Sequence, residues 1–297
     1  MTISSPRHVH SAPLHRPLAA ALWMIGSIVF FSTIAVAGRE LKGRHDTFEI
    51  MMWRSLIGVL LVAGFAVWTG RFREVSAHRL GTHAVRNTIH FTGQNLWLWA
   101  LTMIPLAQLF AIEFTAPIWV VLLSPLLLGE RLTRRRVFAA GLGFMGILIV
   151  ARPDFSHVDP GVLAAAGAAV SFAVTILITK TLTRHESIVS IMFWLTLMQL
   201  ILGLVAAGYD GEMRLPDAET LPWLVLIGVA GLAAHVSLTT ALSLAPASFV
   251  MPIDFVRLPV AAVIGVVLYN EGLEVPVVVG AALILAANWI NLRARGR

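Results

Sequence analysis

The sequence predicts an all-α integral membrane protein with ten transmembrane helices arranged as two five-helix inverted repeats. Three observations carry this prediction. The 297-residue chain is 58% hydrophobic and 13% charged, whereas a soluble domain is about 25% charged. Ten apolar runs are each long enough to cross ~30 Å of hydrocarbon as a helix of ~20 residues. The two halves of the chain also match at an offset of 141 residues, which joins Ala100 to Ala241.

The apolar runs are predicted to be helices because lipid offers no hydrogen-bond partner to an open strand edge. The first run has a second interpretation as a signal peptide, since Ala35-Val36-Ala37 resembles a cleavage site. It is longer than the usual apolar region of about 7–15 residues, so we expect an uncleaved span. The predicted spans cover residues 18–37, 48–68, 84–103, 105–127, 135–151, 160–181, 188–207, 221–241, 246–268 and 273–291.

The loops differ in basic charge between the two faces of the predicted membrane protein. Because cytoplasmic loops are enriched in Lys and Arg, the more basic face is predicted to be cytoplasmic, and both termini lie on it. That face carries Arg7, Arg16, Arg71, Arg73, Arg79, Arg131, Arg134, Arg135, Arg136, Lys180, Arg184, Arg293, Arg295 and Arg297. The other face carries Arg39, Lys42, Arg44, Arg152 and Arg214.

The repeat aligns without a gap in the runs ALTMIPLAQLFAIEF, from Ala100, and ALSLAPASFVMPIDF, from Ala241. Five spans per half is an odd number, so the second half enters the membrane from the opposite side. This inverted arrangement is that of many secondary transporters. We therefore expect a basic cytoplasmic tail over residues 1–17 and two repeats over residues 18–151 and 160–292.

Glu113 and Asp254 occupy equivalent positions of the repeat, deep in apolar runs. A helical rise of 1.5 Å per residue puts each roughly 12 Å from the surface where its span begins, near the midplane. An acid at that depth is a functional-site hypothesis, and we expect the pair to bind a cationic group or a coupling proton. Asp254 has a second interpretation, a structural pair with Arg257 three residues later. For Glu113 the alternative is a tertiary pair with Arg54 or Arg86.

The third span carries a polar stripe in which Arg86, His90 and Gln94 recur every fourth residue and Trp97 follows on roughly the same face. Gln94 matches His235 in the second half. Polar groups on a membrane helix face protein or water rather than lipid. We expect Gln94, His90 and His235 to orient a solute, and the two imidazoles are candidate proton carriers because they titrate near neutral pH.

These polar side chains also have structural interpretations. Either His can be neutral and hydrogen-bonded across a helix interface, Arg86 can extend to the cytoplasmic surface, and Trp97 can pack rather than stack on a ligand. Arg54 lies a turn or two inside its span. It is either an anchor that reaches headgroups or a helix end, or an anion-binding group.

Several functional classes are disfavoured by the sequence. The chain has no cysteine, which excludes disulfides and thiolate metal sites. It has no P-loop, GxSxG, HExxH or EF-hand motif, so we expect neither an enzyme nor a cofactor. The net charge of +6 would suggest nucleic acid in a soluble protein, but most Arg residues flank apolar runs, so we expect no nucleic-acid partner. The expected partners are the lipid bilayer, a small-molecule solute and a coupling proton, with the chain a monomer or homodimer.

Three motifs resemble one family. Gly129-Glu130-Arg131-Leu132-Thr133 closes the fourth span ahead of a Gly-rich fifth span, and Asn270-Glu271-Gly272-Leu273 repeats this signal in the second half. Arg54 also follows Glu49 by a few residues. With the ten spans, this order resembles the EamA-type drug/metabolite transporters over roughly residues 18–292. It departs from their pattern at Asn270, where the first half has Gly129.

The resemblance implies a central cavity lined by the third, fourth, eighth and ninth spans, alternating access, and small organic solutes. The solutes of such proteins include amino acids, S-adenosylmethionine, riboflavin, nucleosides and drugs. Together with the polar residues above, it implies a secondary transporter of the bacterial inner membrane for a zwitterionic or cationic metabolite. The alternatives are a drug, flavin or nucleoside transporter of the same fold, a non-transporting scaffold and a multi-pass membrane enzyme.

Overall fold

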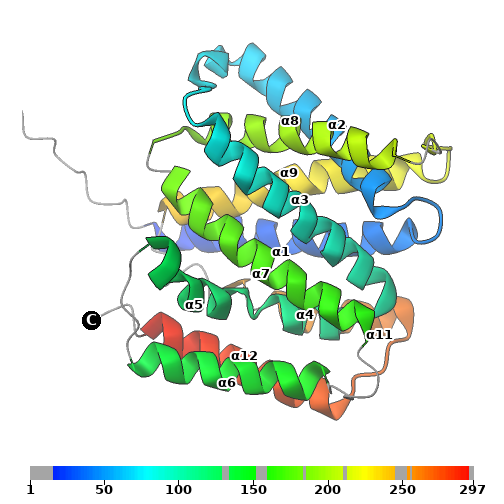
Figure 1. The fold of residues 1–297 in the computed structure, drawn as a ribbon. Coiled ribbons are helices and arrows are strands. Elements are labelled where there is room, and N and C mark those ends of the chain that lie inside the picture. Colours follow the sequence, from blue (N-terminus) through cyan, green and yellow to red (C-terminus); the bar gives the residue numbers. More distant parts are fainter. Residues whose placement is uncertain are drawn as a thin grey trace, which may run out of the picture.

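The computed structural model describes residues 16–128, 134–151, 159–182, 185–209, 213–244, 253–254 and 256–293. Regular structure in these residues is helical throughout, which confirms the predicted all-α class (Figure 1). The predicted tail up to residue 15, the motif over residues 129–133 and the start of the ninth span lie outside the described residues.

Eight of the ten predicted spans are followed closely by single helices, and the fourth and ninth spans differ. The helices are α1 (Pro17–Glu40), α2 (Thr47–Trp68), η1 (Arg71–Glu74), α3 (Leu80–Met103), α4 (Leu106–Glu113), α5 (Ala116–Leu128), α6 (Arg134–Ala151), α7 (Pro160–Leu182), α8 (Ile188–Ala207), α9 (Leu221–Leu244), α11 (Arg257–Tyr269) and α12 (Val275–Arg293). Among the described residues, five helices (α1, α2, α7, α8 and α9) are long and apolar enough to cross a membrane, and shorter apolar helices accompany them. α3 is 24 residues long, but its polar stripe makes it less apolar than these five.

Local sequence signals set several helix ends. At the start of α2, Asp46 accepts a hydrogen bond from the Glu49 amide at 2.8 Å, and the Glu49 carboxylate accepts one from the Asp46 amide at 3.1 Å. This reciprocal pair is a capping box. At the end of α11, Asn270 adopts the left-handed conformation with φ of 52°, which Asn tolerates better than most residues. Asn270 therefore fills a helix-ending position that would otherwise favour glycine.

The fourth span is broken, which corrects the continuous helix expected over residues 105–127. α4 ends at Glu113 and α5 begins at Ala116. Pro117 has no N–H to donate to the Glu113 carbonyl, so the helical hydrogen bonds are interrupted there. Thr115 turns the chain, and its hydroxyl donates to the Ile112 carbonyl at 2.6 Å. The break places Glu113 at a helix terminus within the bundle.

The ninth span is divided at an equivalent place. Asp254 is helical, Val256 lies in a turn, and α11 begins at Arg257. Pro259, in the first turn of α11, lacks the N–H that a continuous helix would use. The continuous helix expected over residues 246–268 is therefore also corrected in its described part. Each half places one acid beside a discontinuity.

Helices pair across the two halves in a pattern that is unchanged when the halves are exchanged. α2 packs on α8, α4 on α11, and α6 on α12, and each of these pairs joins equivalent spans. α1 packs on α9 and α3 on α7, and these two pairs convert into each other at the offset of 141 residues. Figure 1 shows α6 and α12 side by side at the lower edge, with α2 and α8 near the upper edge. This pseudo-symmetry fits an inverted repeat.

α6 and α12 meet at the level of their backbones. A Cβ added to Gly146 would lie 2.8 Å from the Gly280 carbonyl oxygen and 3.2 Å from the Ile284 amide nitrogen. Neither backbone atom can move without displacing α12. Small residues at such crossings permit close helix packing within membranes, and this crossing closes one edge of the bundle.

We predict that Gly146→Ala destabilises the protein by about 1–3 kcal/mol, because the added methyl group overpacks the α6–α12 crossing. The measurement is the thermal unfolding midpoint of purified protein in detergent. Gly141→Ala is the matched control on the same helix, where an added Cβ meets nothing within 4 Å. Equal midpoints for the two variants would contradict the proposed crossing.

Candidate functional site

A cavity lies at the centre of the bundle and has an aromatic and charged wall. It encloses about 60 Å³ of water-accessible volume, which is room for roughly four water molecules. Seven helices contribute to it: α1, α2, α3, α4, α7, α9 and α11. Its lining residues are Phe31, Ile34, Arg54, Gln94, Trp97, Leu98, Glu113, Phe172, Ile227 and Arg257.

The two predicted acids meet at one arginine. Arg257 Nη2 lies 3.2 Å from Glu113 Oε1 and 3.0 Å from Asp254 Oδ2. Trp97 Nε1 donates a hydrogen bond of 2.7 Å to Glu113 Oε2. The Asp254–Arg257 pair expected from the sequence is present. The tertiary partner suggested for Glu113, Arg54 or Arg86, was wrong, because Arg257 takes that place from the facing half of the chain.

Glu113 and Arg257 each lie at a helix end whose partial charge has the same sign as their own, which is unfavourable. Glu113 is the last residue of α4, where the macrodipole is negative, and Arg257 is the first residue of α11, where it is positive. Glu113 therefore relies on Arg257 for compensation, whereas Arg257 is compensated by Glu113 and by Asp254. Within a bundle, removing one partner of such a buried pair costs about 3–5 kcal/mol.

Three phenylalanine rings surround the same guanidinium group. Arg257 Cζ lies 4.7 Å from the ring centroid of Phe31, 5.3 Å from that of Phe110 and 5.0 Å from that of Phe114. These are cation–π distances. We refer to the three rings as the aromatic cage. The sequence analysis did not select these residues, although Phe114 stands directly after Glu113 in the aligned repeat.

Arg54 is a second cation in the wall of the central cavity, and no carboxylate pairs with it among the described residues. Its one described hydrogen bond is a 3.6 Å contact from Nη1 to Met51 Sδ. It also lines a smaller cavity with Ser55, Gln199 and His235. The guanidinium group therefore faces the protein interior, which rules out the expected alternative of a headgroup anchor. Gly231 of α9 makes room for it, because a Cβ there would lie 2.6 Å from Arg54 Nε.

His90 and His235 lie together beside the cavity. Their ring centroids are 5.8 Å apart at an interplanar angle of 71°. Both His90 nitrogens and His235 Nε2 have no hydrogen-bond partner among the described residues. His90 is absent from the wall of the central cavity and instead packs against Phe172, with ring centroids 5.8 Å apart.

Arg86 is fixed inside the bundle rather than extended to the cytoplasmic surface, which corrects that interpretation. It is 3% exposed. Its Nε donates to the Thr179 hydroxyl of α7 at 2.9 Å, and its Nη1 donates to the Asn87 side-chain oxygen at 2.9 Å. It does not line the central cavity. The binding roles expected for Arg86 and for the other polar residues stay predictions.

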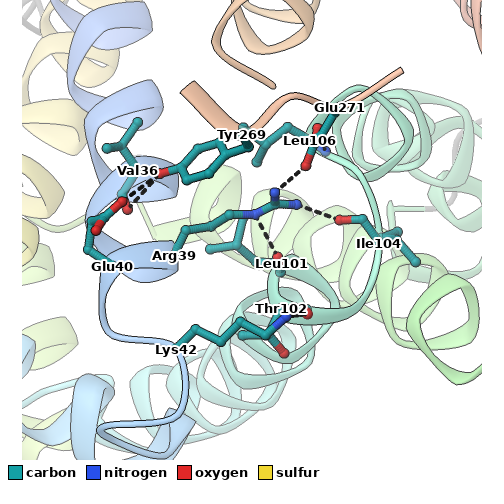
Figure 2. Close-up of polar contacts among 10 residues, drawn as sticks. All are labelled: Val36, Arg39, Glu40, Lys42, Leu101, Thr102, Ile104, Leu106, Tyr269 and Glu271. Carbon is teal, nitrogen blue, oxygen red and sulfur yellow. Dashed lines mark hydrogen bonds and ion pairs between the residues drawn. The ribbon is translucent and has the colours of Figure 1, made fainter. Parts of the chain in front are cut away.

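One end of the cavity-lining helices is tied by a polar network, which the sequence analysis missed. Arg39, near the end of α1, donates to the carbonyls of Leu101 at 3.0 Å and Ile104 at 2.6 Å, and its Nη1 pairs with Glu271 (Figure 2). Glu271 in turn accepts a hydrogen bond from the Leu106 amide at 2.8 Å. We call Arg39 and Glu271 with these partners the end network. Its only sequence signal was Glu271 in the repeated motif.

The described geometry defines a class of protein: a multi-pass helical membrane protein built from two equivalent halves around a small cavity with charged and aromatic walls. In such folds the solute site lies where discontinuous helices of the two halves meet. The chain belongs to the EamA-like transporter family, whose model matches residues 18–152 and again residues 159–293. This family assignment agrees with the resemblance found in the sequence.

Similar proteins include transporters of two kinds of metabolite. A riboflavin transporter of Brucella anthropi is 30% identical over 248 residues, which cover 82% of this chain and 87% of that protein. An S-adenosylmethionine uptake transporter of Rickettsia prowazekii is 26% identical over 266 residues, or 89% of each chain. A protein known from its crystal structure shares the fold, with a TM-score of 0.65, 18% identity, and coverage of 94% of this chain and 99% of that chain.

The end network generates a prediction about access to the cavity. The chain has no native cysteine, so Ile34→Cys, in the cavity wall, introduces a single thiol. We expect a membrane-impermeant maleimide added outside to label it roughly 10–100-fold faster when Glu271→Gln is also present, because a charged hydrogen bond is lost. The rates are measured by gel shift in whole cells.

Glu40→Gln is the matched control for this labelling experiment. Glu40 is exposed and accepts a hydrogen bond from the Tyr269 hydroxyl at 3.2 Å in the same region (Figure 2), but among the described residues no side-chain hydrogen bond or ion pair joins it to Arg39 or Glu271. It should leave the labelling rate unchanged. Labelling that is equally fast in all backgrounds would mean that the end network does not close the cavity.

Proposed function

We propose that this protein is a secondary transporter that carries a small zwitterionic or cationic organic metabolite across the bacterial inner membrane by alternating access. The observation that carries the proposal is that a separate basic group and acidic group, Arg54 and Glu113, line the same cavity. Arg54 lacks a carboxylate partner among the described residues, and Glu113 shares its single cation with Asp254. The site therefore offers an anion-binding group and a cation-binding group to the same solute.

The two charged groups come from different walls. Arg54 belongs to α2 and lies against Gly231 of α9, whereas Glu113 and Arg257 lie where α4 meets α11. A solute carboxylate would pair with the Arg54 guanidinium, which recognises carboxylates through two parallel hydrogen bonds. A solute cation would approach Glu113. Gln94 would complete the polar contacts of the solute.

The apolar part of the wall suits an organic group between the charges. Phe31, Trp97 and Phe172 all line the cavity, and aromatic faces bind planar or cationic groups. S-adenosylmethionine, named in one group of relatives, has a carboxylate, an ammonium, a sulfonium and a planar base. Riboflavin, named in another, is planar but has no charged group to match Arg54 and Glu113. The charges therefore favour an amino-acid-like solute over a flavin.

Alternating access would use the two halves, residues 18–151 and 160–292, as moving units. The end network would close the cavity on the outer face, and both termini would lie in the cytoplasm.

Glu113 and Asp254 are also the candidate carriers of a coupling proton, with His90 and His235 beside the cavity. The chain builds the cavity alone, so a monomer suffices for transport, and a homodimer would not share the site. No chemical change of the solute or cofactor is part of the proposal.

We predict that Glu113→Gln lowers solute uptake into proteoliposomes by roughly 10–100-fold, since a charge-assisted contact to the solute is lost. Asp254→Asn is the matched control and should lower uptake less, because Asp254 does not line the cavity.

A thermal unfolding screen of the purified protein against amino acids, S-adenosylmethionine, riboflavin and nucleosides identifies the solute, since a ligand of the folded state raises the unfolding midpoint. Wild-type uptake by Glu113→Gln would refute the assignment of Glu113, and stabilisation by riboflavin alone would favour the flavin alternative.

A second prediction concerns Arg54. In Gly231→Ala the added Cβ would lie 2.6 Å from Arg54 Nε and 2.9 Å from Nη2, so the flexible guanidinium moves while the fold persists. We expect about tenfold weaker binding of a zwitterionic ligand and unchanged binding of the corresponding amine without its carboxylate. Gly64→Ala, on the helix of Arg54 but with nothing within 4 Å, is the control. Equal losses for both ligands would exclude Arg54 as the carboxylate partner.

A further inference from the structure

The Arg257 guanidinium group occupies a site that is suited to a cation in general. The aromatic cage surrounds it at 4.7–5.3 Å from each ring centroid, and two carboxylates contact the same nitrogen. Guanidinium is weakly hydrated, so it stacks on aromatic faces at little desolvation cost. Sulfonium and quaternary ammonium groups share this property, and aromatic cages bind them in the same way.

Glu113, Asp254 and Arg257 form a buried charge cluster. When both acids are ionised, the cluster carries one net negative charge. Glu113 and Asp254 contribute two negative charges, and Arg257 is the one cation that contacts either of them among the described residues. Isolated charges inside a bundle are costly, whereas paired charges are tolerated. A second cation would therefore complete the cluster.

Two atoms of the cluster have no partner. Asp254 Oδ1 and Arg257 Nε make no hydrogen bond among the described residues, although Asp254 is only 7% exposed and Arg257 only 6%. A guanidinium group and a carboxylate can pair through two parallel hydrogen bonds. The two unpartnered atoms are the ones that such a pairing between Arg257 and Asp254 would use, and this pairing would leave Glu113 free.

The cavity also lacks the volume for a metabolite in the described arrangement. Its water-accessible volume of about 60 Å³ compares with total volumes of roughly 300–1,000 Å³ for ligand pockets. A space for roughly four water molecules does not hold an amino acid with a side chain. Since Arg257 lines the cavity, withdrawal of its side chain enlarges the space next to Glu113.

We propose that Arg257 is an internal counter-ion that holds the place of the solute cation in the empty carrier. On binding, a guanidinium, sulfonium or quaternary ammonium group enters the aromatic cage and pairs with Glu113. Arg257 withdraws to pair with Asp254 through two hydrogen bonds. The solute's role rests on the proposed transport function, whereas the existence of the cation subsite does not.

The subsite is tested without transport and without the natural solute. Arg257→Ala leaves a cage and two carboxylates with no cation, and ethylguanidinium supplies the missing group. We expect ethylguanidinium to raise the thermal unfolding midpoint of the purified full-length variant and to bind it at least ~10-fold more tightly than it binds the wild type. Ethylurea, its neutral analogue of similar shape, should not stabilise the variant.

Two further variants locate the effect. Adding Glu113→Gln to Arg257→Ala should weaken ethylguanidinium binding by roughly 10–100-fold, because the charge-assisted hydrogen bond is lost. Arg86→Ala removes another buried arginine, which contacts Thr179 and Asn87 and no described carboxylate. It should gain no stabilisation from ethylguanidinium. Equal rescue of Arg86→Ala, or equal stabilisation by ethylurea, would overturn the proposal.

If Arg257→Ala does not fold, Arg257→Lys carries the test. Its ammonium is more strongly hydrated and cannot form the two parallel hydrogen bonds with Asp254, so ethylguanidinium should stabilise it more than the wild type. An identical response of Arg257→Lys and wild type would refute the subsite. Failure of the proposed function has a different signature: ethylguanidinium rescues the variants, but no metabolite stabilises the wild type.

Discussion

The centre of this protein depends on one ion pair between its two halves, the 3.2 Å contact of Arg257 with Glu113. Both residues lie at helix ends where the spans are broken. Each has the same sign of charge as the partial charge of its helix end, which is unfavourable. Without Arg257, Glu113 would be left unpaired, and an unpaired charge in a low-dielectric interior is costly. Any movement that separates α4 from α11 must therefore give Glu113 another cation or a proton.

The same two helices connect this ion pair to the end network. α4 runs from Leu106 to Glu113 and α11 from Arg257 to Tyr269. They are joined at one end by the central ion pair and at the other by the hydrogen bond from the Leu106 amide to Glu271. Arg39 adds bonds to the carbonyls at the end of α3 (Figure 2), which have no partner within their own helix. The central ion pair and the end network are thus physically linked through two short helices.

The backbone is symmetric, but the site is not. At the repeat offset, Arg54 corresponds to Leu195, Trp97 to Leu238 and Arg257 to Ala116. The helix pairs nevertheless exchange into one another when the halves are swapped. A symmetric scaffold would give the two equivalent arrangements of the halves that the proposed alternating access requires. Asymmetric side chains would make the cavity selective for one kind of solute, because recognition depends on which charges and rings face it.

The sequence by itself determined the membrane class, the helical form, the repeat and the equivalent positions of Glu113 and Asp254 in it, because all of these follow from apolar length and spacing. It also identified Asp254 and Arg257 as partners, since they lie three residues apart. Only the tertiary structure decided that Arg257 serves both acids, that Phe31 and Phe110 surround it, that Gly231 makes room for Arg54, and that Arg39 meets Glu271. These contacts join residues far apart in the chain. Local patterns do not encode which faces of two helices meet; packing across the whole bundle does.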